Sequence, residues 1–168
     1  MFSAAVRAEQ ARRGSRESNA RRAARGGFVG ELTADVIAFI TERDSAYLAT
    51  ASADGQPYVQ HRGGPPGFLR VLDERTVAFA DFAGSRQYIS SGNLTENKRA
   101  FLFLMDYAAA RRLKLWGQAR VVDGDTDLLA RLIDAAYPAR VERAIVFTVT
   151  AWDWNCSQHI PRLVPAER

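Results

Sequence analysis

The chain has 168 residues, a length that suits one domain with a hydrophobic core of its own. Hydrophobic residues make up 47% of it and charged residues 25%, which are ordinary values for a soluble globular protein. No apolar run reaches the roughly 18 residues that a membrane-spanning helix needs. The single cysteine, Cys156, excludes a disulfide within the chain, so a cytoplasmic location is expected.

The net charge of +4 is unevenly distributed along the chain. Residues 1–27 hold seven arginines and two glutamates, a net of +5, so the remaining 141 residues sum to −1. We therefore expect a basic, helical arm over 1–27 and a separate domain over 28–168. A solvated or dimer-embracing helix is favoured over a disordered leader or a polyanion contact, so nucleic-acid binding is not expected.

The first half of the domain alternates strand patterns with turns. Thr33 suits the N-cap of a short amphipathic helix over 34–40. Apolar alternation then predicts four strands, over 45–52, 57–62, 68–72 and 76–82. The turn between the first two contains Gly55, which suits a positive φ.

The second half continues in the same way. A loop over 83–87 and a short helix over 88–94 precede strands over 99–107 and 111–122, where Gly117 indicates a bulge or a close approach. A helix over 124–136, a last strand over 143–152 and an irregular tail follow. Six or seven strands with accessory helices predict a mainly β protein, a small antiparallel barrel. Such a barrel has no room inside for a large cofactor, so a ligand would lie outside it or between two subunits.

Two segments carry features of an anion or ring site. In Gln60–Gly67, a strand ends in His61 and Arg62 and meets glycines whose N–H groups a ligand can approach; the alternative is a loop with charged ends. In Gly84–Gln87, a glycine, a hydroxyl and an arginine precede a helix, which is typical of a phosphate site but weak in isolation.

Two further segments carry cations and aromatic rings. Arg112, Lys114 and Trp116 share one face of a strand, either against an anion or flavin carbonyl or as a solvated face that covers a dimer partner. The tail from Trp152 to Arg162 holds two tryptophans that suit packing on a flavin ring. The spacing of Cys156 and His159 suggests a nucleophile or metal, but a metal needs three or four ligands and the chain has only two histidines. No metal site is expected.

These four segments, in this order on this strand pattern, resemble the pyridoxamine 5′-phosphate oxidase-like family of FMN-binding split β-barrels. The resemblance runs from about Ser45 to Arg162 and is most specific in DGQPY, GSR and RRLKLWGQA. Gln60 and Gln87 stand where the vitamin B6 oxidases usually carry Arg and Lys. The closer likeness is therefore to uncharacterised flavoproteins of the family.

The resemblance implies a homodimer with FMN in a groove between the subunits. It implies that Ser85 and Arg86 bind the phosphate, that the Ala80–Asp81 strand end contacts the ring, and that Arg112, a C-terminal tryptophan and Arg162 come from the second subunit. The expected cofactor-binding residues are Gln60, His61, Arg62, Gly63, Gly64, Ala80, Asp81, Ser85, Arg86, Gln87, Arg112, Trp152, Trp154 and Arg162.

The implied activity is that of an FMN-dependent oxidoreductase acting on a small molecule. The flavin itself would carry hydride or electron transfer, so no catalytic side chain is singled out. Two alternatives stay open: a flavin-binding sensor or carrier without turnover, and a member of the same fold that binds haem or the deazaflavin F420.

Overall fold

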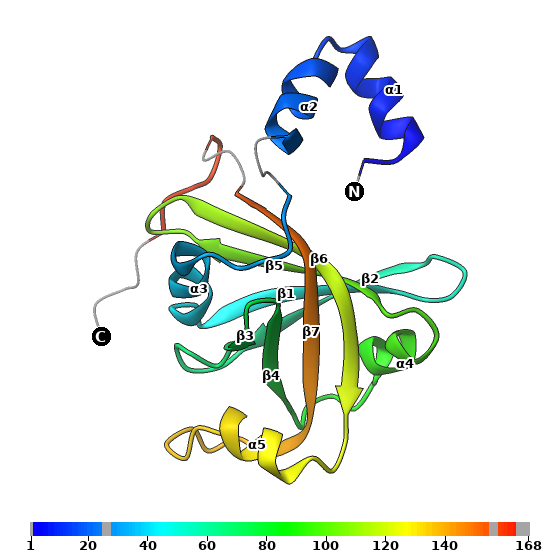
Figure 1. The fold of residues 1–168 in the computed structure, drawn as a ribbon. Helices are drawn as coiled ribbons and strands as arrows, with labels where there is room; N and C mark the ends of the chain where they lie inside the picture. Colours follow the sequence, from blue (N-terminus) through cyan, green and yellow to red (C-terminus); the bar gives the residue numbers. More distant parts are fainter. Residues whose placement is uncertain (1, 25–27, 155–157, 164–168) are drawn as a thin grey trace.

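The computed structural model describes residues 2–24, 28–154 and 158–163. Five helices and seven strands lie within these ranges (Figure 1). The helices are α1 (Ala4–Arg12), α2 (Arg16–Ala24), α3 (Ala34–Thr41), α4 (Ile89–Glu96) and α5 (Thr126–Leu132). The strands are β1 (Ser45–Ala51), β2 (Pro57–Gly63), β3 (Arg70–Asp73), β4 (Thr76–Phe82), β5 (Arg99–Asp106), β6 (Arg111–Val122) and β7 (Val141–Trp154).

All seven strands belong to one antiparallel sheet in the order β2-β1-β5-β6-β7-β4-β3. The sheet is not closed, because β2 and β3 stand at its two ends and pair with different neighbours. A mainly β, antiparallel split barrel with accessory helices was the expectation from the sequence, and the structure confirms it.

The main core lies on the inner face of this sheet. Alternate residues of β1, β5 and β6 point inward, and Leu48, Leu102 and Leu115 among them are fully buried. Phe79 of β4, Phe147 of β7 and Ile40 of α3 complete the same cluster. Each buried side chain of this size contributes roughly 1.5–3 kcal/mol relative to leaving it exposed.

A smaller cluster lies on the opposite face of β4 and β7, beneath α5. Ala78, Ala80 and Ala144 are buried there against Leu132 of α5. The small alanine side chains allow the helix to lie close to the strands. The Asp125 carboxylate caps α5 by accepting a hydrogen bond of 2.9 Å from the N–H of Leu128. The helix ends at Leu132, earlier than the expected 136.

The long β6–β7 pair contains an irregularity at Gly117, as the sequence predicts. Trp116 pairs with Ala151 and Gly117 with Val149, so Thr150 is an extra residue in β7. A Cβ at Gly117 would lie only 2.2 Å from the Thr148 carbonyl oxygen, which explains the glycine. The extra residue turns Trp152 toward the core side of the strand.

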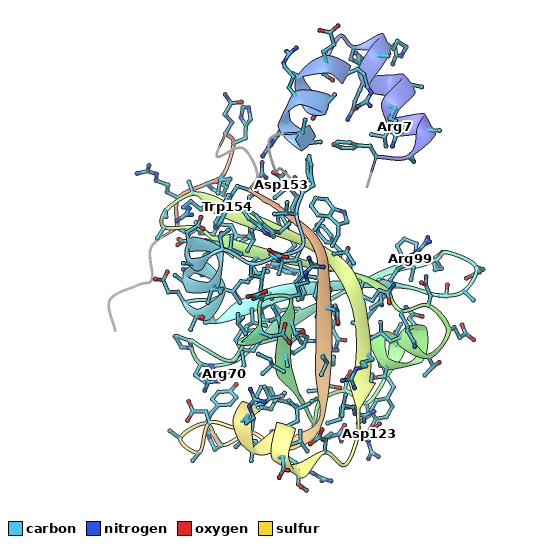
Figure 2. All side chains as sticks on the ribbon, viewed as in Figure 1. Arg7, Arg70, Arg99, Asp123, Asp153 and Trp154 are labelled. Atoms are coloured by element: carbon cyan, nitrogen blue, oxygen red, sulfur yellow. The ribbon has the colours of Figure 1, made fainter. Side chains whose placement is uncertain are left out.

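β7 is longer than the sequence predicts. It begins at Val141 and continues to Trp154, so Asp153 and Trp154 belong to the strand and not to the irregular tail that was expected after residue 152. After the bulge the two tryptophans pack against the main core, while Asp153 points to the other face beside Lys114. Figure 2 shows Asp153 and Trp154 at the end of β7 that lies toward α2, with Asp123 near the opposite end.

The basic N-terminal residues form the two helices α1 and α2, which bury no residue of their own and lie apart from the strands (Figure 1). Arg22 is paired with Asp153 and donates to the Trp154 carbonyl at 3.2 Å. Phe28 makes edge contacts with Phe2 and Trp116. The division between arm and domain at residue 27 stays a prediction. In the described ranges, no helix is both long and apolar enough to cross a membrane.

Candidate cofactor site

A small pocket lies between β2, the end of β4, the loop over 83–88 and the start of α4, and we call it the seam pocket. Six residues expected from the sequence line it: Gln60, Arg62, Asp81, Ser85, Arg86 and Gln87. Its volume is about 50 Å³. Sites that enclose a whole small-molecule ligand usually measure roughly 300–1,000 Å³. The pocket in one chain therefore suits one polar group of a ligand.

The inner wall of the seam pocket is a polar network that joins β2 to β4 without backbone pairing. Arg62 is paired with Asp81, and the two side chains are only 12% and 10% exposed. Arg62 also donates to the Gln60 side-chain oxygen at 2.9 Å, and the Ser90 hydroxyl donates to the same oxygen at 2.9 Å. These contacts hold the Arg62 guanidinium in one orientation.

One donor in this wall and a second one beside it have no acceptor. The Nε atoms of Arg62 and Arg143 are buried and lack a hydrogen-bond partner among the described residues. Arg143 Nε lies 3.6 Å from an Asp81 oxygen, near enough for attraction but too far for a hydrogen bond. Buried N–H groups are nearly always satisfied, so an acceptor from outside the chain fits this position.

The outer wall is the exposed loop between β4 and α4. Arg86 and Tyr88 have φ values of 59° and 54°, in the left-handed region that non-glycine residues rarely adopt. Arg86 Nε donates to the Tyr88 hydroxyl at 3.3 Å, and this hydroxyl lies 3.5 Å from a Glu142 oxygen. The Tyr88 hydroxyl and then the Glu142 charge raise the pKa of Arg86.

Glu142 also contacts Arg143, which lies beside it on β7 at a distance of 3.1 Å between Nη2 and Oε2. Burial lowers the pKa of Arg143, but the Glu142 hydrogen bond and the Asp81 charge outweigh it and raise the pKa above its ordinary value. The Arg143 guanidinium lies over the Tyr88 ring, 4.8 Å from its centre. The raised pKa values of Arg86 and Arg143 favour the charged form of both guanidinium groups.

His61 lies away from the seam pocket, although Gln60 and Arg62 are its neighbours. Alternate residues of a strand face opposite sides. The imidazole is on the outer face of the sheet, with its ring 5.6 Å from that of Tyr47. The two glycines after Arg62 have packing reasons: a Cβ at Gly64 would lie 2.7 Å from Phe68, and one at Gly63 would lie 3.0 Å from the His61 ring.

The other expected residues lie elsewhere in this chain. Ala80 is buried beneath α5. Trp152 donates from its ring nitrogen to the Glu31 carbonyl at 2.7 Å, and Trp154 packs edge-on against Phe39. Arg162 is exposed in the C-terminal segment. Cys156 is outside the described residues, and no group of three or more His, Cys, Asp or Glu among those described could hold a metal ion.

Arg112 belongs to a second surface, on the outside of β2, β1, β5 and β6. Cross-strand pairing places the side chains of this surface on one face, and we call it the outer aromatic face; it comprises Tyr47, Ala49, Val59, His61, Phe101, Phe103, Tyr107, Arg112, Lys114 and Trp116. Val59 is 58% exposed there. The Arg112 Nε atom is buried without a hydrogen-bond partner in the described part of the chain.

Several lining residues were not among the expected ones, including Tyr88, Ser90 and Glu142, and neither was Arg143, which lies beside the pocket. Ser90 and Tyr88 follow the GSR segment closely, so a search of the adjacent helix start would have found them. Glu142 and Arg143 are more than 50 residues away in the chain and reach the pocket only through the β4–β7 pairing of Asp81 with Arg143. No local pattern marks them.

The comparisons with known proteins agree with the fold. A family model described as pyridoxamine 5′-phosphate oxidase matches residues 32–156, well over half of the chain. The chain therefore belongs to the pyridoxamine 5′-phosphate oxidase family, which confirms the resemblance seen in its sequence. No curated protein matches it.

Several solved structures share the fold. HupZ of Group A Streptococcus is 15% identical with a TM-score of 0.55, over 79% of this chain and 98% of that one. A protein related to general stress protein 26 from Clostridium acetobutylicum is 13% identical with a TM-score of 0.51, over 75% and 87%. An FMN-binding protein from Syntrophomonas wolfei is 12% identical with a TM-score of 0.53, over 73% and 87%. At these identities the likeness shows the fold alone.

Proposed function

We propose that the chain binds FMN with the phosphate in the seam pocket, and that it works as a homodimeric oxidoreductase on a small molecule. The observation that carries the proposal is the two arginines that line the pocket, the buried Arg62 with its unsatisfied Nε and the exposed Arg86. A phosphate has several acceptor oxygens and prefers arginine partners. The start of α4 adds N–H groups and positive potential on the same side.

The size of the pocket supports a site shared by two chains. About 50 Å³ suits the phosphate but not the flavin ring, so the ring needs a second surface. The outer aromatic face offers one, because it combines exposed apolar side chains with the unsatisfied Arg112 Nε. Contiguous apolar patches of this kind usually mark an interface. In the proposed dimer, this face of one copy meets that of the other and Arg112 completes the neighbouring site.

Family membership and the FMN-binding protein of Syntrophomonas wolfei support the choice of flavin. When bound, the flavin would supply hydride or electron transfer. The chain's own residues would bind and orient it. Arg86 and Ser85 would hold the phosphate. The network of Gln60, Arg62 and Asp81 would form a rigid inner wall, which would face the rest of the cofactor.

The proposal is tested by titrating the purified chain with FMN and following flavin fluorescence. We expect saturable binding at micromolar FMN, and then reduction of the bound flavin by NADH or NADPH. Binding without any reduction by either donor would support the sensor or carrier alternative. A Soret band after addition of haem, or binding of F420 but not of FMN, would replace flavin with that ligand.

A further inference from the structure

Glu142 adds a second carboxylate, besides Asp81, to a pocket that is lined by Arg62 and Arg86. Its carboxylate contacts Arg143 at 3.1 Å and the Tyr88 hydroxyl at 3.5 Å, and Tyr88 in turn accepts from Arg86 at 3.3 Å. One carboxylate therefore engages two arginines: Arg143 beside the pocket directly, and Arg86 of the pocket through the Tyr88 phenol. Its side chain is 17% exposed, so water screens these contacts only in part.

The two walls of the seam pocket are held with unequal strength. The inner wall has short contacts: the buried Arg62–Asp81 pair and the two 2.9 Å bonds to Gln60. The outer wall depends on bonds of 3.3 and 3.5 Å that link the exposed Arg86 and Tyr88 to Glu142, and these lengths are near the limit for a hydrogen bond. Its loop also has two residues with left-handed φ. The outer contacts are thus the ones that an entering anion can replace.

We infer that Glu142 is an internal counter-ion that competes with the ligand's phosphate for Arg86 and Arg143. A phosphate that enters the pocket binds these guanidinium groups, and the hydrogen bond from Arg86 to the Tyr88 hydroxyl breaks. Glu142 then faces the phosphate as a like charge, which lowers the affinity for it. The inference rests on the proposed function for the identity of the ligand, but the competition itself concerns any phosphate.

The variant Glu142→Gln tests this, because the amide keeps the shape and an acceptor for Tyr88 but removes the charge. Asp123→Asn is the matched control: Asp123 lies 4.0 Å from Arg143 but is 74% exposed and does not line the pocket. The full-length chain is titrated calorimetrically with inorganic phosphate, FMN and riboflavin. Thermal melting of each variant checks the fold.

Removal of one half-buried like charge should tighten binding of inorganic phosphate and FMN by roughly three- to tenfold. Riboflavin, which lacks the phosphate, should bind Glu142→Gln and the native chain within about twofold of each other. Asp123→Asn should bind phosphate like the native chain. Equal or weaker phosphate binding by Glu142→Gln, or no phosphate binding by either chain, would overturn the inference.

The phosphate and FMN titrations separate this inference from the proposed function. If Glu142→Gln binds phosphate more tightly but neither this variant nor the native chain binds FMN, the proposed function is refuted and the counter-ion role of Glu142 is supported. If Glu142→Gln does not fold, Tyr88→Phe is the second test of the inference. It removes the hydroxyl that links Glu142 to Arg86 and leaves the Arg143–Glu142 pair. Tighter phosphate binding by Tyr88→Phe supports the inference, and unchanged binding contradicts it.

Discussion

At the scale of single residues, Arg86 is the exposed cation of the seam pocket, and its loss tests the phosphate position. Arg86→Ala should weaken FMN binding by roughly tenfold or more, because the phosphate would lose a hydrogen bond from a charged group. The measurement is a fluorescence titration with FMN. Riboflavin binding should change little, because the lost contact is to the phosphate.

Arg131→Ala is the control for this substitution, since Arg131 is an exposed arginine of α5 that does not line the seam pocket. It removes the same charge from the chain and should leave the FMN affinity within about twofold. An equal loss in both variants would mean that overall charge, and not a contact in the pocket, governs binding. If Arg86→Ala binds FMN as tightly as the native chain, the phosphate does not bind at Arg86.

The residues of the pocket were partly predictable from the sequence. Gln60 and Arg62 were expected together with His61, but strand alternation separates them, and only the first two reach the pocket. A motif of consecutive residues on a strand includes side chains from both faces, and only one face can line a given pocket. Glu142 was not predictable, because its place beside Tyr88 depends on which strands pair across the sheet.

At the scale of the elements, the β6–β7 bulge depends on Gly117. In Gly117→Ala the new Cβ would meet the Thr148 carbonyl oxygen at 2.2 Å and the Phe147 ring at 2.6 Å. The backbone must shift, so we expect a loss of at least roughly 1–3 kcal/mol, the usual cost of overpacking. Urea denaturation measures it.

Gly92→Ala is the matched control for the bulge. Gly92 lies within α4, and a Cβ there meets nothing within 4 Å. Because alanine favours a helix interior, this variant should be as stable as the native chain or more stable by up to about 1 kcal/mol. If Gly117→Ala unfolds at the same urea concentration as the native chain, the claim that the bulge leaves no room for a Cβ at residue 117 is contradicted.

Asp106 links the end of β5 to the segment after α3. Burial raises the pKa of its carboxyl, but the Ala109 N–H at 2.8 Å and Arg43 at 3.0 Å outweigh burial and lower the pKa. A carboxyl whose pKa is lower in the folded state stabilises the fold above its unfolded pKa of about 3.9, and this stabilisation is lost as the pH falls through the folded value.

Asp106→Asn should therefore lower the free energy of unfolding by roughly 1–3 kcal/mol at neutral pH. The difference from the native chain should shrink below about pH 4, where the native carboxyl also becomes neutral. Glu42→Gln is the control, because Glu42 contacts the same Arg43 but is 68% exposed, so it should change stability by less than about 1 kcal/mol. A difference for Asp106→Asn that is undiminished at pH 3 would contradict this assignment.

Most elements were predictable because their patterns are local. The alternation in β1 and β6 and the apolar face of α3 gave bounds close to the observed ones. The end of β7 was not predictable. The bulge at Thr150 reverses the alternation of the strand, so Trp154 was assigned to an irregular tail although it packs against the core. α5 ends early because Ile133 already leaves the helical conformation, with ψ of 131°.

At the scale of the whole molecule, the outer aromatic face is the surface through which the proposed dimer would form. Val59 is 58% exposed in the single chain, so Val59→Glu should leave the fold intact. In the proposed dimer it would bury a charge without a partner, and the variant should be monomeric. Light scattering after size-exclusion chromatography measures the mass, and circular dichroism checks the fold.

Ile133→Glu is the matched control, because Ile133 is 46% exposed just after α5 and lies outside that face. It should keep the mass of the native protein. If the Val59→Glu protein keeps the native mass, the dimer interface does not include this part of β2. A native protein that is already monomeric would remove the dimer from the proposal.

The architecture as a whole was predictable from the number and spacing of the strands, since short antiparallel strands with tight turns favour a small barrel. The approach of β2 to β4 was not predictable, because the Arg62–Asp81 contact joins residues of strands that do not pair. The seam pocket lies at that contact. Its position is a property of the folded sheet more than of any segment.

One experiment addresses the central claim most directly: size-exclusion chromatography of the chain reconstituted with FMN, with light scattering and flavin absorbance recorded on the same peak. We predict a mass twice the 18.6 kDa of the chain and one bound FMN for each chain. Protein that elutes without flavin after incubation with excess FMN would contradict the claim that this split barrel is a flavoprotein.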